Sequence, residues 1–136
     1  MWKNYKRENK NIHFAFEDLD VWRKAVEFSS EVIDLVDTLQ TDRKHYRLIE
    51  QLESAVTSIA MNIAEGKGRY SQKEFIQFLY YARGSLFETI TLIEIFKRKN
   101  WINIEQYNNA RAKGSDIGKM LSSLINSIKK SNVTKP

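Results

Sequence analysis

The strongest constraint on the fold is that nothing in the chain interrupts a helix before the last residue. The single proline is Pro136, and proline is the residue that breaks helices most effectively. Apolar residues recur throughout at three- and four-residue spacing, and the strict alternation typical of strands is absent. The sequence therefore predicts an all-α fold.

The helical pattern divides into four segments, at about residues 18–40, 44–65, 72–99 and 103–130. Asp18 is a good N-cap residue for the first of them. Because the connections are short, we expect an antiparallel up-down-up-down four-helix bundle. The predicted core rows are Val21, Ala25, Phe28, Val32, Leu35 and Leu39; Leu48, Leu52, Ala55, Ile59 and Ile63; Phe75, Leu79, Ala82, Leu86, Ile90 and Ile93; and Tyr107, Ala110, Gly114, Ile117, Leu121, Leu124 and Ile128.

These segments are expected to form a single domain between two tails. With 136 residues, of which 42% are hydrophobic, the chain can bury one core. We expect a basic, flexible tail over 1–14, the bundle over 15–130, and a second flexible tail over 131–136. The absence of cysteine excludes disulfides and thiolate sites. Because no apolar run resembles a signal peptide or a membrane span, we expect a cytoplasmic protein without a membrane partner.

The turn between the second and third segments packs several local signals into thirteen residues. Gly66 and Gly68 suit the left-handed geometry that closes many helices. Ser71 and Glu74 have the spacing of a capping box, in which each side chain bonds a free backbone N–H of the new helix. The turn therefore predicts where the second helix ends and the third begins.

The charge is unevenly distributed along the chain. The net charge is +5, yet residues 14–40 carry seven acidic and only two basic side chains. The remaining basic surface could attract phosphate backbones, or it could simply be solvated. The first helix also carries a second apolar row, Trp22, Val26, Ile33 and Val36. Surplus apolar surface favours self-association, the alternative being a wide core-facing stripe.

Catalytic and metal-binding patterns are weak. Asp42 and His45 provide only one half of a carboxylate–histidine metal pair, and the sequence around Gly66 lacks the P-loop pattern. Glu65 and Glu88 could form a carboxylate pair for acid–base chemistry. We favour a structural role for both, as acceptors of hydrogen bonds. We therefore expect no enzymatic activity, no metal and no cofactor.

Basic side chains provide the candidate binding residues. Arg69 stands beside Tyr70, and a guanidinium next to a ring can contact a nucleic-acid backbone and stack on a base. The candidate nucleic-acid-binding residues are Lys67, Arg69, Lys73, Arg83, Lys97, Arg98 and Lys99. The residues to which we assign a structural role are Asn62, Glu65, Gly66, Ser71, Glu74, Ser85 and Glu88.

Several of these motifs together resemble one known family. The matching segments are 16–25 (FEDLDVWRKA), Gln51-Leu52, Ser58-Ile59, 62–66 (NIAEG), Arg69, Ser71, Phe75 and 82–88 (ARGSLFE). They resemble the small four-helix-bundle proteins encoded in intervening sequences of bacterial 23S rRNA genes. The accessory variability determinant of diversity-generating retroelements is a member of the same family. The resemblance covers most of the chain, roughly residues 16–128.

The resemblance implies a non-enzymatic bundle that assembles as a ring, typically a homopentamer, and it allows nucleic-acid binding. In the retroelement branch, the pentamer partners a reverse transcriptase and its RNA. Two hypotheses follow for this chain. The first is an oligomeric accessory protein that binds RNA or DNA, and the second is a scaffold that docks another protein through the ring surface.

Overall fold

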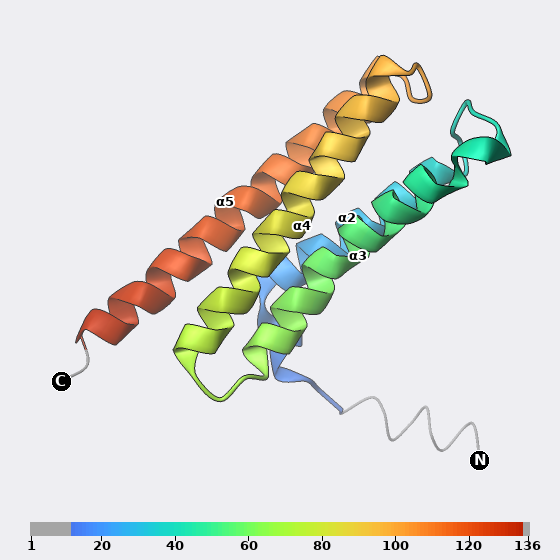
Figure 1. Ribbon diagram of the computed structural model, residues 1–136. Coiled ribbons are helices and arrows are strands. Elements are labelled where there is room, and N and C mark those ends of the chain that lie inside the picture. The colour runs from blue at the N-terminus through green and yellow to red at the C-terminus, as the bar shows by residue number, and fades with distance from the viewer. Residues whose placement is uncertain (1–11, 135–136) are drawn as a thin grey trace, which may run out of the picture.

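The structure, a computed structural model, describes residues 12–134, which fold into four long helices and two short 3-10 helices without any strand (Figure 1). The long helices are α2 (Asp20–Val36), α3 (Tyr46–Lys67), α4 (Gln72–Arg98) and α5 (Ile104–Thr134). The 3-10 helices are η1 (Ala15–Asp18) and η2 (Arg43–His45). The prediction of an all-α chain with four helices is confirmed.

The four long helices enclose one shared core. Helix α3 packs against α2 and α4, and α5 packs against α4 and α2, whereas α2 and α4 do not contact each other. The turn between α3 and α4 lies at one end of the molecule, and the other two connections lie at the opposite end (Figure 1). Helices α2 and α4 therefore occupy opposite corners of the arrangement.

The predicted apolar rows supply most of the core. The fully or nearly buried members include Val21, Ala25, Phe28, Val32, Leu52, Ile59, Ile63, Leu79, Ala82, Leu86, Ile93, Ile117 and Leu121. The second apolar row of α2 behaves differently. Trp22 and Val36 are partly buried, but Val26 and Ile33 remain 41% and 37% exposed. Part of this row is therefore not used by the core.

The first helix begins and ends inside its predicted limits. It starts at Asp20, after the N-cap Leu19, and no side chain bonds its first turn. Asp18 is therefore not the N-cap; it closes η1 instead, and its carboxylate lies 2.8 Å from His13 Nε2. The helix ends at Val36 rather than near residue 40, and beyond it the Gln40 amide donates to the Trp101 carbonyl at 3.0 Å. This bond ties the loop to the start of α5.

The turn between α3 and α4 confirms the capping box and corrects the role of the glycines. The Ser71 hydroxyl accepts from the Glu74 amide at 3.1 Å, and the Glu74 carboxylate accepts from the Ser71 amide at 3.5 Å. No glycine within residues 12–134 has a positive φ, so the expected left-handed closure is wrong. Gly66 is buried inside α3, where an added Cβ would lie 2.6 Å from the Phe78 Cβ. Its small size is needed for close packing of α3 on α4.

The two ends of the α4–α5 connection are capped differently. Asn100 adopts the left-handed conformation, with φ of 61°, just after α4. Asn103 and Gln106 form a reciprocal box: the Asn103 side chain accepts from the Gln106 amide at 2.8 Å, and the Gln106 side chain accepts from the Asn103 amide at 2.9 Å. Helix α5 then continues to Thr134, past the predicted boundary at 130. Residues 1–11 and 135–136 of the predicted tails lie outside the described part.

Candidate functional site

The turn between α3 and α4 carries three exposed cations and one exposed ring. We call Lys67, Arg69, Tyr70 and Lys73 the basic corner; Tyr70 is fully exposed. The Arg69 guanidinium lies 2.7 Å from the Glu65 carboxylate and 4.5 Å from the centre of the Phe78 ring. These contacts hold the guanidinium beside the turn. Arg69 and Tyr70 are both exposed, but the ring that the Arg69 guanidinium lies over is Phe78.

The two lysines of the basic corner are less constrained than the arginine. The Lys67 ammonium lies 5.7 Å from the centre of the Phe75 ring. Lys73 is exposed, and no ion pair of its side chain occurs within residues 12–134. Neither lysine is therefore paired with a described carboxylate, whereas Glu65 offsets part of the charge of Arg69.

The remaining predicted cations do not join the basic corner. Lys97, Arg98 and Lys99 lie at the opposite end of α4, which is 27 residues and therefore about 40 Å long. Arg98 Nε also lies 3.1 Å from the Glu94 carboxylate. Arg83 lies between the two ends. The seven candidates therefore form no single site on one chain.

Glu94 is the centre of a polar cluster that joins α4 to α5. Its carboxylate accepts from the Tyr107 hydroxyl at 2.6 Å and from Arg98 at 3.1 Å, and Arg111 lies 3.8 Å away. The hydrogen bond from Tyr107, followed by that from Arg98, lowers the pKa of Glu94. The same bond raises the pKa of Tyr107. Glu94 is therefore held as a carboxylate that partly neutralises the cations around it.

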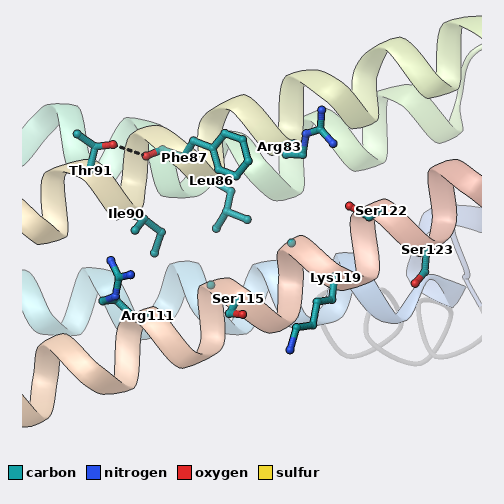
Figure 2. A pocket seen from close by; sticks show the side chains of 12 residues that line it. Arg83, Leu86, Phe87, Ile90, Thr91, Arg111, Ser115, Lys119, Ser122 and Ser123 are labelled. Atoms are coloured by element: carbon teal, nitrogen blue, oxygen red, sulfur yellow. Dashed lines mark hydrogen bonds between the residues drawn. The ribbon is translucent and has the colours of Figure 1, made fainter.

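A groove of about 790 Å³ runs along the outer side of α4 and α5 (Figure 2). Leu86 and Ile90 point from α4 into the space between the two helices. Phe87 lies on the same helix and is 59% exposed. On α5, Gly114 and Gly118 allow Ile90 and Leu86 to pack closely: an added Cβ would lie 2.6 Å from Ile90 Cδ1 at Gly114 and 3.4 Å from Leu86 Cδ2 at Gly118. The floor of the groove is therefore apolar.

The rim of the groove is positively charged. Arg83 extends from α4 on one side, and Lys119 extends from α5 on the other (Figure 2). Arg111 completes the set, and none of the described residues that line the groove is acidic. The sequence analysis missed Arg111 and Lys119, since the helical pattern does not show which helices will be neighbours. The available signal was the repeat of small residues every four positions, Gly114, Gly118 and Ser122.

A second tyrosine, Tyr80, contacts two cations in the first half of α4. Lys129 Nζ donates to the Tyr80 hydroxyl at 2.9 Å, and the Arg83 guanidinium lies 4.8 Å from the centre of the ring. The hydrogen bond from Lys129 lowers the pKa of Tyr80. The positive surface therefore continues from Arg83 toward the end of α5.

The residues assigned a structural role divide into those with contacts and one without. Ser58 accepts from the Ser85 hydroxyl at 2.9 Å and from the side-chain amide of Asn62 at 2.9 Å, so these side chains join α3 to α4. Glu65 pairs with Arg69. Glu88 is exposed, and its side chain makes no hydrogen bond or ion pair with any residue that the structure describes. The proposed pairing of Glu65 with Glu88 receives no support from this arrangement.

The structure also shows where the histidine candidates lie. The His45 ring packs against Trp101 in a tilted arrangement with centroids 4.7 Å apart, so it contacts the connection between α4 and α5. Over residues 12–134, no group of three or more His, Asp or Glu side chains could hold a metal ion. In the same described range, no helix is both long enough and apolar enough to cross a membrane.

Four long helices around one core, with an exposed basic turn and a basic apolar groove, define a small all-α protein of the four-helix class. The chain belongs to the family of 23S rRNA-intervening sequence proteins, whose family model matches residues 17–123. It is also similar to a crystal structure from Bacteroides thetaiotaomicron VPI-5482, described as a protein of unknown function from the S23 ribosomal protein family. That similarity has 30% identity and a TM-score of 0.72, over 77% of this chain and 97% of the other. A comparison with curated proteins finds no match.

Proposed function

We propose that this chain is a non-enzymatic accessory protein that binds RNA or DNA and acts in the cytoplasm. Its antiparallel up-down-up-down bundles would assemble as a homo-oligomeric ring, a pentamer by analogy with the resemblance described above. Membership of the 23S rRNA-intervening sequence protein family supports an RNA-associated role. Neither metal nor cofactor is part of the proposal.

The observation that carries the proposal is the basic corner. Tyr70 is fully exposed, and the exposed cations Lys67, Arg69 and Lys73 lie within three residues of it along the chain. An exposed ring is a stacking platform for any base, and neighbouring cations neutralise the phosphates that flank it. Assembly into a ring would repeat this corner once per chain, which would increase the avidity for a long nucleic acid.

A fluorescence titration of labelled single-stranded RNA, structured RNA and duplex DNA tests the proposal. The logarithm of the affinity should fall linearly with that of the salt concentration, by about 0.7–0.9 per phosphate contact. The variant Lys67→Gln/Lys73→Gln should reduce that slope by roughly 1.4–1.8. The control Lys24→Gln/Lys44→Gln removes the same charge from α2 and η2, and it should change the slope less.

Two results would contradict the proposal. One is the absence of binding at micromolar protein and low salt. The other is an equal loss of slope in the two double variants, because binding would then follow net charge rather than the basic corner.

The second candidate function is a scaffold that docks another protein, such as the reverse transcriptase implied by the resemblance. The observation that favours it is the exposure of large apolar side chains on α3, where Tyr46 and Met61 are 51% and 66% exposed. A pull-down that recovers one protein partner and resists nuclease would favour this function. Loss of the partner after nuclease treatment would favour the nucleic-acid function.

A further inference from the structure

The outward face of α2 and the groove between α4 and α5 have opposite chemistry on two separate surfaces. Val26, Ser30, Ile33 and Asp37 are all exposed and follow a four-three-four spacing, so they form one row on α2. Glu27 and Asp34 stand beside this row and are also exposed. We call these six residues the acidic face of α2. It combines an apolar strip with four carboxylate or hydroxyl side chains, at odds with the basic character of the rest of the chain.

The groove offers the complementary arrangement. Its floor is apolar, with Leu86, Phe87 and Ile90, and its rim carries Arg83, Arg111 and Lys119 with no acidic lining residue among the described positions. We infer that the groove binds the acidic face of α2 from a second copy of this chain. This inference rests on the oligomeric part of the proposed function, and it specifies which surfaces meet.

The lengths of the two surfaces agree. From Val26 to Asp37 is eleven residues, or about 17 Å along α2. The α5 side of the groove extends from Arg111 to Ser123, which is twelve residues or about 18 Å. A helix laid along the groove would meet the apolar side chains of α4 and the cations of both helices, because Gly114 and Gly118 already pack against Ile90 and Leu86. The acidic face of α2 is therefore long enough to contact the groove along its whole length.

The contact cannot form within one chain. Helix α2 occupies the corner opposite α4 and does not contact it, and the buried row of α2, including Ala25 and Phe28, already faces the core. The acidic face therefore points away from the groove of its own chain. Because the two surfaces differ, the contact between copies is heterologous, and such contacts generate closed rings or open chains.

Charge also argues against residues 1–11 of the chain as the segment that occupies the groove. Residues 1–11 carry four basic side chains and one acidic side chain. A basic segment would be repelled by Arg83, Arg111 and Lys119, whereas the carboxylates of Glu27 and Asp34 would be attracted. Complementary potentials of this kind select the partner and set its register.

Charge reversal with restoration tests the pairing, with the molar mass measured by light scattering in the absence of nucleic acid. The groove variant Arg83→Glu/Lys119→Glu and the α2 variant Glu27→Lys/Asp34→Lys should each weaken association by roughly tenfold or more. The chain that combines all four substitutions should regain most of the wild-type association, because opposite charges face each other again. The control Lys44→Glu/Lys73→Glu changes the charge as much as the groove variant, away from both surfaces.

Circular dichroism shows whether each variant is folded. We expect the α2 variant to fold, because Glu27 and Asp34 are exposed and make no ion pair within the described residues. An additional variant, Phe87→Ala, removes apolar contact without changing charge, and it should weaken association while leaving the helical content unchanged. Association that the α2 variant leaves intact would overturn the pairing, as would a failure of the combined variant to recover.

The outcomes separate this inference from the proposed function. If the wild-type chain assembles and only the α2 variant has no effect, the pairing is wrong and the ring stands. If the wild-type chain is a monomer at all concentrations, both the pairing and the ring are wrong. The nucleic-acid titration then still tests whether the chain binds RNA or DNA. If the groove variant weakens RNA binding and the α2 variant leaves the molar mass of the assembly unchanged, the groove binds nucleic acid and the pairing is overturned.

Discussion

The Ser85 hydroxyl on α4 donates a hydrogen bond to the Ser58 hydroxyl on α3 at 2.9 Å, across 27 residues of sequence. The side-chain amide of Asn62 donates to the same Ser58 hydroxyl at 2.9 Å. The Thr89 hydroxyl donates to the Ser85 backbone carbonyl at 2.8 Å. This polar contact lies between the two helices that share the most extensive interface. It fixes the register of α3 against α4, since a shift of either helix would separate partly buried hydroxyls.

The variants Ser58→Ala and Ser85→Ala should each reduce the free energy of unfolding by about 1 kcal/mol, the usual net contribution of one hydrogen bond. The double variant should cost less than the sum of the two, because both single variants lose the same bond. Urea unfolding of the four chains measures the coupling. Strictly additive losses would show that the two hydroxyls do not depend on each other.

Gly66→Ala should destabilise the protein by about 1–3 kcal/mol, because overpacking forces neighbours to move. The added Cβ would lie 2.6 Å from the Phe78 Cβ and 3.1 Å from a ring atom of Phe75. The matched control is Gly84→Ala, since nothing lies within 4 Å of a Cβ added there. Gly84 is exposed in the middle of α4, so this variant should gain about 0.5–1 kcal/mol. Thermal unfolding should show a lower Tm for Gly66→Ala and a higher Tm for Gly84→Ala. An equal change in Tm in the two variants would refute the packing argument.

Asn103→Ala should cost about 1 kcal/mol, because it removes the acceptor for the Gln106 amide in the first turn of α5. Asn103→Asp retains an acceptor at the same place and is expected to be nearly neutral. The Gln106 side chain also donates to the Thr38 hydroxyl at 3.0 Å, so loss of the cap should loosen the contact with the end of α2. Hydrogen exchange of the first amides of α5 measures this directly, and unchanged exchange in Asn103→Ala would rule out a capping role.

Tyr107→Phe should raise the pKa of Glu94 toward its ordinary value of 4.5, because the hydrogen bond from Tyr107 is the main cause of its lowering. A carboxyl group with a lowered pKa in the folded state stabilises the fold above its unfolded pKa, and this stabilisation is lost as the pH falls through the folded pKa. The variant should therefore be less stable than wild type near neutral pH, and the difference should narrow below pH 4.5.

Carboxyl NMR of Glu94 gives its pKa in both chains, and urea unfolding at the two pH values gives the stability difference. The control Tyr70→Phe removes a hydroxyl from a fully exposed ring and should leave the pKa of Glu94 unchanged. A constant stability difference at both pH values would contradict the link to Glu94 ionisation.

Local features of the sequence predicted the helices well. The start of α4 follows from Ser71 and Glu74, whose capping box requires only residues three apart in sequence. The predicted rows of α2 and α3 lie in the core, because helical periodicity places them on one face of each helix. The prediction for Asp18 was wrong because a 3-10 turn and the contact with His13 compete with helix capping at that position.

The sequence by itself determined the fold class, the number of helices and the capping box of Ser71 and Glu74. These features depend on spacing along the chain, and residues three or four apart necessarily share a helix face. The tertiary structure alone decided that Gly66 is needed for close packing, that Val26 and Ile33 stay exposed, and that Arg83, Arg111 and Lys119 surround one groove. The physical reason is that a groove or an uncovered face depends on which helices become neighbours, and residues far apart in sequence make that choice together through packing.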